Sequence, residues 1–346
     1  MSDHATTDKK PGAIAKSIAT MMGKLRADDD MMALLEVFAS LDPNAIEKIT
    51  PAEARLNPTM ADAVDVLLKQ QGRSTSPEDL VPGITSRDVS IEGAVGSLPA
   101  RLYTPAGAGP FPVIVYFHGG GWVIADKQVY DGGARGLAKQ ANAIVVSVDY
   151  RRAPENKFPA AWDDAFAAYR WVANNVANIN GDPSRMGLAG ESAGGNLAVA
   201  TAVAVRDAGL PPPRHVLAVY PVAQTSLNTE SELENAVAMP LNRAMVKWFV
   251  EHLVNSAADL KDPRLSLIDA NLQGLPPVTI VSARIDPLRS DGSKLANALE
   301  TAGVPVERRD FDGVTHEFFG CAAVIEKARE AQAYAGQRFK EAFSVM

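Results

Sequence analysis

A serine between two glycines, in the segment Gly190-Glu191-Ser192-Ala193-Gly194, is the first candidate for chemistry in this chain. An apolar run ends just before it, and small residues at helical spacing follow it. At a sharp turn from strand to helix the backbone is strained, only residues without bulk fit beside the serine, and its hydroxyl is exposed. The pattern therefore predicts a nucleophile at Ser192. An ordinary glycine-rich turn has the same letters, so a nucleophile also requires a base, an orienting acid and oxyanion donors elsewhere.

His316 is the candidate base among the five histidines of the chain. It follows the last predicted strand, over residues 306–311, and it comes after the serine and the candidate acid, which is the order expected for a serine at such a turn. Ligands of open parallel sheets bind at the carboxyl ends of the strands, so this loop is well placed. The other four histidines have other expected places: His4 in the N-terminal tail, His118 before a glycine loop, His215 at the start of a strand and His252 in a helix.

Asp286 is the candidate acid, because it comes soon after the apolar run 278–281. In this position it would fix the tautomer of the histidine and stabilise its cation. Asp291 is better placed as a helix-start or ion-pair residue. Asp262 and Asp269 are weaker alternatives, since neither follows a strand so closely.

Three consecutive glycines, at 119–121, follow the apolar run 113–117 and lie between His118 and Trp122. Consecutive glycines cost conformational entropy, and they are useful where bare backbone N–H groups must closely approach a partner such as the anion that develops on an acyl oxygen. Two of these N–H groups, with that of Ala193, are expected to form an oxyanion hole. A merely tolerant, flexible loop is the alternative interpretation.

Together these residues predict acyl transfer by a serine nucleophile. Ser192 would attack an acyl carbon, and His316 would take its proton and later give it to the leaving alcohol. Asp286 would hold the imidazole in place. By contrast, the charged segment Asp149–Glu155 is interpreted as a structural network of ion pairs and hydrogen bonds that holds the glycine loop, without a catalytic role.

Continuous apolar runs predict the strands that must position these loops, because strands buried on both faces of a sheet have this composition. Helical patterns lie between the runs, for example over 160–175 and 294–302, so we expect a parallel sheet with right-handed crossovers and helices on both faces. Residues 89–92 and 98–103 alternate apolar with polar and predict an antiparallel pair at one edge. The runs are 113–117, 143–148, 186–189, 216–220 and 278–281.

Helical patterns outside this alternation occur near the N-terminus and in residues 225–260, which stand between two predicted strands. One N-terminal helix has a clear start signal: Thr50 as N-cap, Pro51 in the first position and Glu53 placed to return a bond to the cap. Pro58 is expected to interrupt that helix. The N-terminal helical patterns cover 14–25, 28–41 and 50–72.

The expected domain division follows from these two groups of helices. At 346 residues, one large core with a modest appendage is the ordinary arrangement. We expect residues 1–80 and 225–260 to form a helical cap. The catalytic domain would then consist of residues 81–224 and 261–346.

Composition and charge narrow the classes of function. Apolar residues make up 47% of the chain and charged residues 22%, which is ordinary for a folded globular protein. The net charge of −7, without a long basic run, opposes binding to nucleic acid or to an anionic membrane surface. A small neutral molecule is therefore the expected partner.

Cysteine content and hydropathy bear on location and cofactors. The single cysteine, Cys321, excludes an intrachain disulfide and a cysteine-based zinc site, which fits a reducing compartment. No run approaches the roughly 20 apolar residues that span a bilayer, and the first ten residues lack the apolar region of a signal peptide. We expect a cytoplasmic protein without a membrane span, a metal or an organic cofactor.

Five motifs, taken in this order, closely resemble the hormone-sensitive-lipase family of α/β-hydrolases, the bacterial family IV esterases. The resemblance implies a carboxylesterase with an α/β-hydrolase fold, an eight-stranded, mostly parallel sheet and a helical cap. It favours Gly120 and Gly121 over Gly119 as oxyanion donors, and it suggests a homodimer through the last strand and helix. The motifs are His118-Gly119-Gly120-Gly121-Trp122, Asp149–Glu155, Gly190-Glu191-Ser192-Ala193-Gly194-Gly195, Asp286-Pro287-Leu288-Arg289 and His316.

Two residues depart from the family pattern. Glu191 stands where the family more often has Asp or Thr, and Glu317 stands where a glycine often follows the histidine. Neither departure removes a member of the predicted triad. The catalytic scheme leaves the identity of Glu191 unexplained.

The predicted function is hydrolysis of small carboxylic esters with short to medium acyl chains. A cap implies an enclosed apolar pocket, and Trp122, Leu288 and Phe318 are its predicted walls. One alternative is a non-catalytic ligand-binding module with the same fold, which the intact Ser192, Asp286 and His316 oppose. Another is an amidase or peptidase that uses the same triad. Aryl, phthalate-like and other xenobiotic esters remain open as natural substrates.

Overall fold

The strands form a single mixed sheet in the computed structural model, which describes residues 26–344. Within these residues the sheet has eight strands in the order β1-β2-β4-β3-β5-β6-β7-β8. The pairs β1/β2 and β2/β4 are antiparallel, and the remaining pairs are parallel, so the predicted eight-stranded, mostly parallel sheet is confirmed. The strands are β1 Ile84–Glu92, β2 Ser97–Pro105, β3 Phe111–Phe117, β4 Ile144–Val148, β5 Gly181–Glu191, β6 Val216–Val219, β7 Val278–Ile285 and β8 Val306–Thr315.

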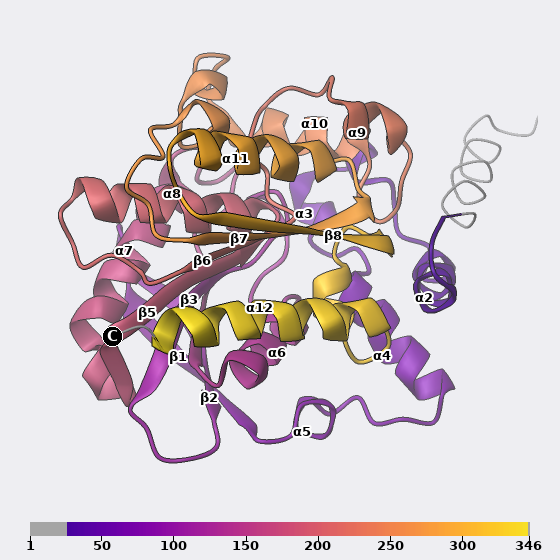
Figure 1. Ribbon diagram of the computed structural model, residues 1–346. Helices are drawn as coiled ribbons and strands as arrows, with labels where there is room; N and C mark the ends of the chain where they lie inside the picture. Colours follow the sequence, from indigo (N-terminus) through magenta and orange to yellow (C-terminus); the bar gives the residue numbers. More distant parts are fainter. Residues whose placement is uncertain (1–25, 345–346) are drawn as a thin grey trace, which may run out of the picture.

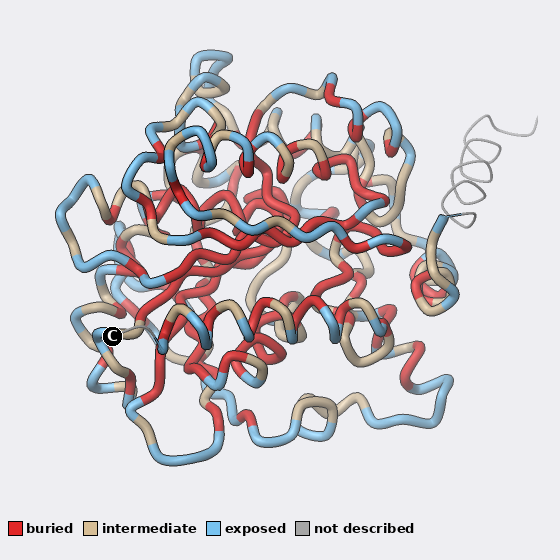
Figure 2. Tube along the Cα trace, viewed as in Figure 1, coloured by how far each residue is buried: buried red, intermediate tan, exposed pale blue. Residues whose placement is uncertain are grey.

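Helices cover both faces of the sheet (Figure 1). On one face α6 and α12 pack against the strands, and on the other face α7, α8 and α11 do so. Every residue of β3 and of β4 is buried, as expected for continuous apolar runs between two helical layers (Figure 2). These helices are α6 Asp131–Ala141, α7 Ala160–Asn175, α8 Ala193–Asp207, α11 Arg289–Thr301 and α12 Glu326–Ser344.

The N-terminal part of the described chain contains short helices, as the spacing predicts. Thr50 accepts from the backbone N–H of Glu53, and the Glu53 carboxylate returns a bond to the N–H of Thr50, so the predicted capping box is present. This helix ends at Ala54, and a non-helical segment that contains Pro58 separates it from the next helix, which begins at Met60. The helix expected over 14–25 lies outside the described residues. The helices are α2 Asp29–Ser40, α3 Pro51–Ala54, α4 Met60–Gln70 and α5 Pro77–Leu80, with a 3₁₀ turn η1 at Ile46–Lys48.

Residues 225–260 contain helices and no strand, and they connect β6 to β7. Two α-helices occur there, α9 Glu230–Glu234 and α10 Arg243–Leu253, and α10 packs against η1 of the N-terminal part. The two helical groups, far apart in sequence, therefore meet. Further 3₁₀ turns are η2 Val176–Ile179, η3 Asp259–Lys261, η4 Leu267–Asp269 and η5 Phe318–Cys321.

Candidate active site

Ser192 lies at the turn between β5 and α8, in the conformation φ +57°, ψ −118°. A positive φ is strained for a non-glycine residue, and it turns the side chain out of the strand. The neighbouring glycines make this turn feasible: a Cβ at Gly190 would overlap the carbonyl of Gly194, and a Cβ at Gly194 would overlap the carbonyl of Phe117. Only residues without a side chain fit these two positions.

The structure brings Ser192, Asp286 and His316 together from three different loops. His316 Nε2 lies 3.0 Å from Ser192 Oγ, and His316 Nδ1 lies 2.8 Å from Asp286 Oδ2. The other carboxylate oxygen of Asp286 accepts from the backbone N–H of Leu288 at 2.8 Å. All three side chains are at least 95% buried. This is the hydrogen-bonded order of nucleophile, base and orienting acid.

The electrostatic surroundings of His316 favour its charged form. Burial opposes the imidazolium, but the carboxylate of Asp286, through its charge and its hydrogen bond, outweighs burial and raises the pKa of His316. Glu317 and Glu191 add to this effect. The imidazole is therefore a stronger base than an isolated histidine.

The glycine loop provides backbone donors beside the serine. Gly120 and Gly121 have φ of +93° and +57°, and both line the same cavity as Ser192 and His316. Within the described residues, neither N–H group donates a hydrogen bond. Ala193 is the first residue of α8, where helical N–H groups lack an intrahelical acceptor. These groups can hold an oxyanion near Ser192.

The segment after β4 supports the glycine loop, as the sequence predicts. The Tyr150 hydroxyl donates to the carbonyls of His118 at 2.9 Å and Gly119 at 3.3 Å, and the rings of Tyr150 and His118 stack at 4.3 Å. Asp149 accepts from the backbone N–H and the ammonium group of Lys127 at 2.6 and 2.7 Å. This segment acts by fixing the loop, and it has no atom in the triad.

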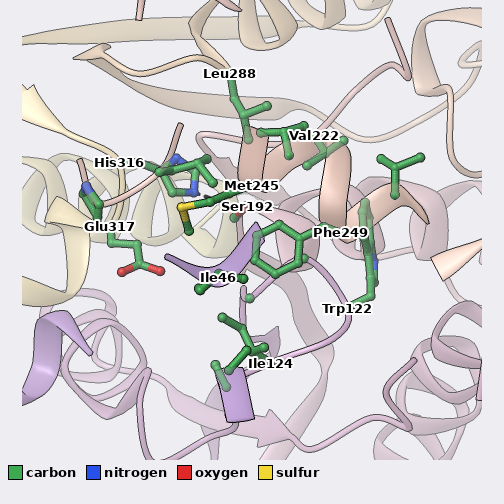
Figure 3. Close-up of a pocket in the computed structure, with 18 of the residues that line it drawn as sticks. Ile46, Trp122, Ile124, Ser192, Val222, Met245, Phe249, Leu288, His316 and Glu317 are labelled. Carbon is green, nitrogen blue, oxygen red and sulfur yellow. Dashed lines mark hydrogen bonds between the residues drawn. The ribbon is translucent and has the colours of Figure 1, made fainter. Parts of the chain in front are cut away.

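The cavity above Ser192 is walled by residues from the sheet loops and from both helical groups (Figure 3). In this view His316 and Leu288 lie to the left and at the top, and Trp122 lies to the right. Ser192 is near the middle, close to Phe249 and Ile46. Its apolar walls include Phe38, Ile46, Met60, Trp122, Ile124, Val222, Leu241, Met245, Phe249 and Leu288, and its polar ones Arg55, Asp126, Arg152, Gln224, Thr225, Ser226, Glu232, Asp291 and Glu317.

Two of the three predicted pocket residues line this cavity, and the third does not. Trp122 is 2% exposed and stacks on Trp162 with ring centroids 5.2 Å apart, and Leu288 is similarly buried. Phe318 instead packs inside the core, with its ring 5.6 Å from that of Phe311. The prediction for Phe318 is corrected here: Glu317, at φ +65°, turns the chain so that Glu317 lines the cavity and Phe318 points into the core.

Glu191, which the catalytic scheme leaves unexplained, is buried behind the serine. The hydroxyls of Tyr116 and Tyr220 donate to its two carboxylate oxygens. Burial raises the pKa of Glu191 to about 7, although the two tyrosines partly oppose this. Tyr220 also packs on His316, with ring centroids 4.4 Å apart. Glu191 therefore connects the turn at the serine to the ring that flanks the base.

Glu317 adds a further carboxylate next to the base. Its Oε1 accepts from the hydroxyl of Tyr130 at 3.1 Å, and burial raises its pKa. Its backbone is in the left-handed region, which glycine adopts without strain. A glycine would therefore fit this position with less strain than Glu317 does.

The patterns of single loops do not indicate the two tyrosine partners of Glu191, Tyr116 and Tyr220. A signal for them existed in the strand ends: Tyr116 lies near the end of β3 and Tyr220 directly follows β6, and these two strands flank β5 in the sheet. Glu191, at the end of β5, lies between them. The order of strands is required to use this signal, and local patterns do not contain it.

Asp291 and the other predicted ionisable residues have structural partners. Asp291, in the first turn of α11, accepts from the backbone N–H of Ala223 at 3.0 Å and from the side chain of Gln224 at 2.9 Å. His215 is buried, with its Nε2 hydrogen-bonded to Thr279 Oγ1 at 3.0 Å. His252 lies in α10, with its Nδ1 2.9 Å from the carbonyl oxygen of Trp248. In residues 26–344 no group of three or more His, Cys, Asp or Glu side chains is arranged to hold a metal ion.

The fold and the site define an α/β hydrolase. The family model for the alpha/beta hydrolase fold matches residues 114–320, which is more than half of the chain. Carboxylesterase NlhH of Mycobacterium tuberculosis is 41% identical over 280 residues, which cover 79% of this chain and 88% of the relative. Ethyl acetate hydrolase of Pseudomonas putida is 34% identical over 251 residues, covering 70% and 78%.

Solved structures of esterases are also similar to this chain. A thermostable esterase from Pseudomonas putida matches with a TM-score of 0.82 and 29% identity, covering 93% of this chain and 99% of that one. An esterase from Pyrobaculum calidifontis matches with a TM-score of 0.78 and 32% identity, covering 88% and 96%. The chain belongs to the hormone-sensitive-lipase family of α/β-hydrolases and is a carboxylic ester hydrolase, not a non-catalytic binding module.

Proposed function

We propose that this chain hydrolyses small carboxylic esters of short to medium acyl chain length, with Ser192 as nucleophile, His316 as general base and Asp286 as orienting acid. The observation that carries this proposal is the continuous pair of hydrogen bonds, 3.0 Å from His316 to Ser192 and 2.8 Å from His316 to Asp286. The cavity volume of about 140 Å³ lies below the roughly 300–1,000 Å³ of drug-sized sites, which supports a small substrate.

The reaction proceeds in two acyl transfers. His316 Nε2 takes the hydroxyl proton as Ser192 Oγ attacks the carbonyl carbon, and the N–H groups of Gly120, Gly121 and Ala193 bind the oxyanion that forms. Collapse of this intermediate breaks the bond to the alcohol, which leaves with the proton from His316. Water, deprotonated by the same imidazole, then attacks the acyl-serine and releases the acid.

The helical groups are proposed to act as a cap, formed by residues 1–80 and 225–260, over a catalytic domain of residues 81–224 and 261–346. Support comes from the cavity walls, to which the N-terminal part contributes Phe38 and Ile46 and the inserted part contributes Met245 and Phe249. A cap over the site would keep bulk water away from the reacting groups, and this strengthens the electrostatic interactions between them.

Two further expectations concern the location and the partners of the chain. In the described part of the chain no helix is long and apolar enough to cross a membrane. The cytoplasmic location stays a prediction. So does a homodimer through the last strand and helix, which is compatible with the place of β8 at an edge of the sheet.

A series of p-nitrophenyl esters from acetate to palmitate, given to the wild type and to Ser192→Ala, tests this function. We expect the wild type to prefer short to medium chains and Ser192→Ala to be inactive. Equal activity of the two proteins would refute the role of Ser192 as the nucleophile. A preference for palmitate would refute the chain-length claim alone.

A further inference from the structure

Glu232 differs from the other buried carboxylates of residues 26–344. It is 1% exposed, and its Oε2 has no hydrogen-bond partner among the described residues. Leaving a buried acceptor unpaired is costly, so this oxygen indicates a place for a donor that comes from outside the chain. The other four all accept hydrogen bonds: Asp164 from Arg151, Glu191 from two tyrosines, Asp286 from Leu288 and Asp291 from Ala223 and Gln224.

The helix that carries Glu232 is held firmly against the loop of the catalytic acid. Ser231 Oγ donates to the carbonyl of Pro287 at 2.5 Å and accepts from the N–H of Ser290 at 2.9 Å. The Asn235 amide donates to the carbonyl of Asp286 at 3.2 Å. The Glu232 carboxylate therefore has a defined place close to the triad, unlike a charged group on a free surface.

Glu232 and Ser192 line one and the same cavity. Two polar residues of the connection that follows β6, Gln224 and Thr225, also line this cavity, and their side chains are already engaged. Gln224 donates to Asp291, and Thr225 donates to the carbonyl of Leu260 at 3.1 Å. Glu232 is thus an acceptor in this wall that the chain's own donors leave unused.

Neighbouring charges do not satisfy Glu232. The guanidinium of Arg243 acts on Glu232 through its charge, while its Nε donates to the carbonyl of Leu227 at 2.8 Å and its Nη2 to Asn228 Oδ1 at 2.9 Å. Burial, together with the charge of Asp291, raises the pKa of Glu232 to about 8. A hydrogen-bond donor on a bound substrate would stabilise the buried carboxylate of Glu232.

We propose that Glu232 is a specificity residue that binds a hydrogen-bond donor, a hydroxyl or an ammonium group, carried by the ester substrate at a distance from the scissile carbonyl. This inference rests on the proposed esterase function and names its substrate class. A methyl group in place of the donor would leave Glu232 unpaired. A site built in this way discriminates strongly against an analogue that lacks the donor.

The test uses isosteric ester pairs, with the acid released followed by pH-stat titration. On the alcohol side, 4-hydroxybutyl acetate is compared with pentyl acetate. On the acyl side, methyl 6-hydroxyhexanoate and methyl 6-aminohexanoate are each compared with methyl heptanoate. The readout is the ratio of kcat/KM for the donor ester to that for its methyl isostere, which is insensitive to the amount of folded enzyme.

We expect the wild type to favour the donor ester about tenfold or more in at least one pair, and Glu232→Leu to lose this preference. Glu230→Leu, on an exposed position of the same helix, serves as the matched control and should keep it. Glu232→Gln provides a second variant if the leucine does not fold: it keeps an acceptor, and we expect it to retain the preference for a hydroxyl and lose that for an ammonium.

The outcomes separate this inference from the function on which it rests. A wild type that hydrolyses the methyl isosteres but shows the same ratio as Glu232→Leu and Glu232→Gln would overturn the role of Glu232 alone. A wild type that hydrolyses none of the esters, including p-nitrophenyl acetate, would overturn the proposed function. A preference for the ammonium ester over the hydroxyl ester would identify the donor as cationic.

Discussion

His316 is surrounded by carboxylates, of which Asp286 bonds it directly while Glu191 and Glu317 act through their charge. A base must be neutral to accept a proton, so its pKa sets the acid limb of the pH profile. Because the pKa of His316 is raised, kcat/KM should fall as the pH decreases through a value above 6.5, the ordinary histidine value.

Replacement of Asp286 by Asn tests this electrostatic account. The variant should lose about 10⁴-fold in kcat, since the amide favours the wrong tautomer, and its acid limb should move to lower pH because the anion that raised the pKa of His316 is gone. The pH profile of kcat/KM measures both effects. Asp269→Asn, an exposed alternative acid, should match the wild type. An unshifted acid limb in Asp286→Asn would contradict the account.

Glu191 links ionisation to stability. Burial raises its pKa from 4.5 to about 7, so between these values the folded chain holds a proton that the unfolded chain has released. Stability from this group is therefore complete below pH 4.5 and declines as the pH rises to about 7. The Glu191→Gln variant does not ionise and is free of this loss.

The melting temperatures of the wild type and of Glu191→Gln, compared near pH 5 and near pH 8, test this linkage. Removal of one acceptor from Tyr116 and Tyr220 should make the variant less stable at the lower pH. At the higher pH the gap should become smaller or reverse. A gap of constant size at the two pH values would show that Glu191 does not titrate in this range.

At the scale of elements, the glycine loop depends on the segment after β4. Tyr150→Phe keeps the ring stacked on His118 but removes the hydroxyl that bonds the carbonyls of His118 and Gly119. We expect a loss of about 1 kcal/mol in the free energy of unfolding. We also expect kcat to fall about tenfold with a smaller change in KM, because the oxyanion donors lose their fixed position.

Tyr169→Phe is the matched control for the loop, since it removes a single hydroxyl bond of 2.8 Å to the carbonyl of Pro211, away from the glycines. It should lower stability by a similar amount and leave kcat unchanged. Equal kcat values for the Tyr150 and Tyr169 variants would mean that the loop needs no support from Tyr150.

At the scale of the whole molecule, local sequence patterns predicted the features of the fold that depend on neighbouring residues alone. Apolar runs identified the strands of the parallel sheet, and small residues around Ser192 identified the turn, because sterics near one residue decide both. The three triad residues were found as side chains that follow strands, since the carboxyl ends of parallel strands share one edge.

The particular side chains through which the two helical groups line the cavity were not predictable in this way. Phe249 of the inserted helices lies against Gly121, and Ile46 of the N-terminal part lines the same cavity, yet the helical pattern alone marks neither as a pocket wall. The prediction of Phe318 as a pocket wall is wrong, because the left-handed turn at Glu317 sends its side chain into the core. A backbone turn of this kind is visible only in three dimensions.

The most direct measurement of the central claim is covalent labelling with diethyl p-nitrophenyl phosphate, which reacts with an activated serine. Intact mass and peptide mapping should show one diethylphosphoryl group, on Ser192, in proportion to the loss of esterase activity. Ser192→Ala should take up none, and His316→Ala should react far more slowly, because the serine then lacks its base. Stoichiometric labelling of another residue, or full inactivation with Ser192 unmodified, would contradict the account.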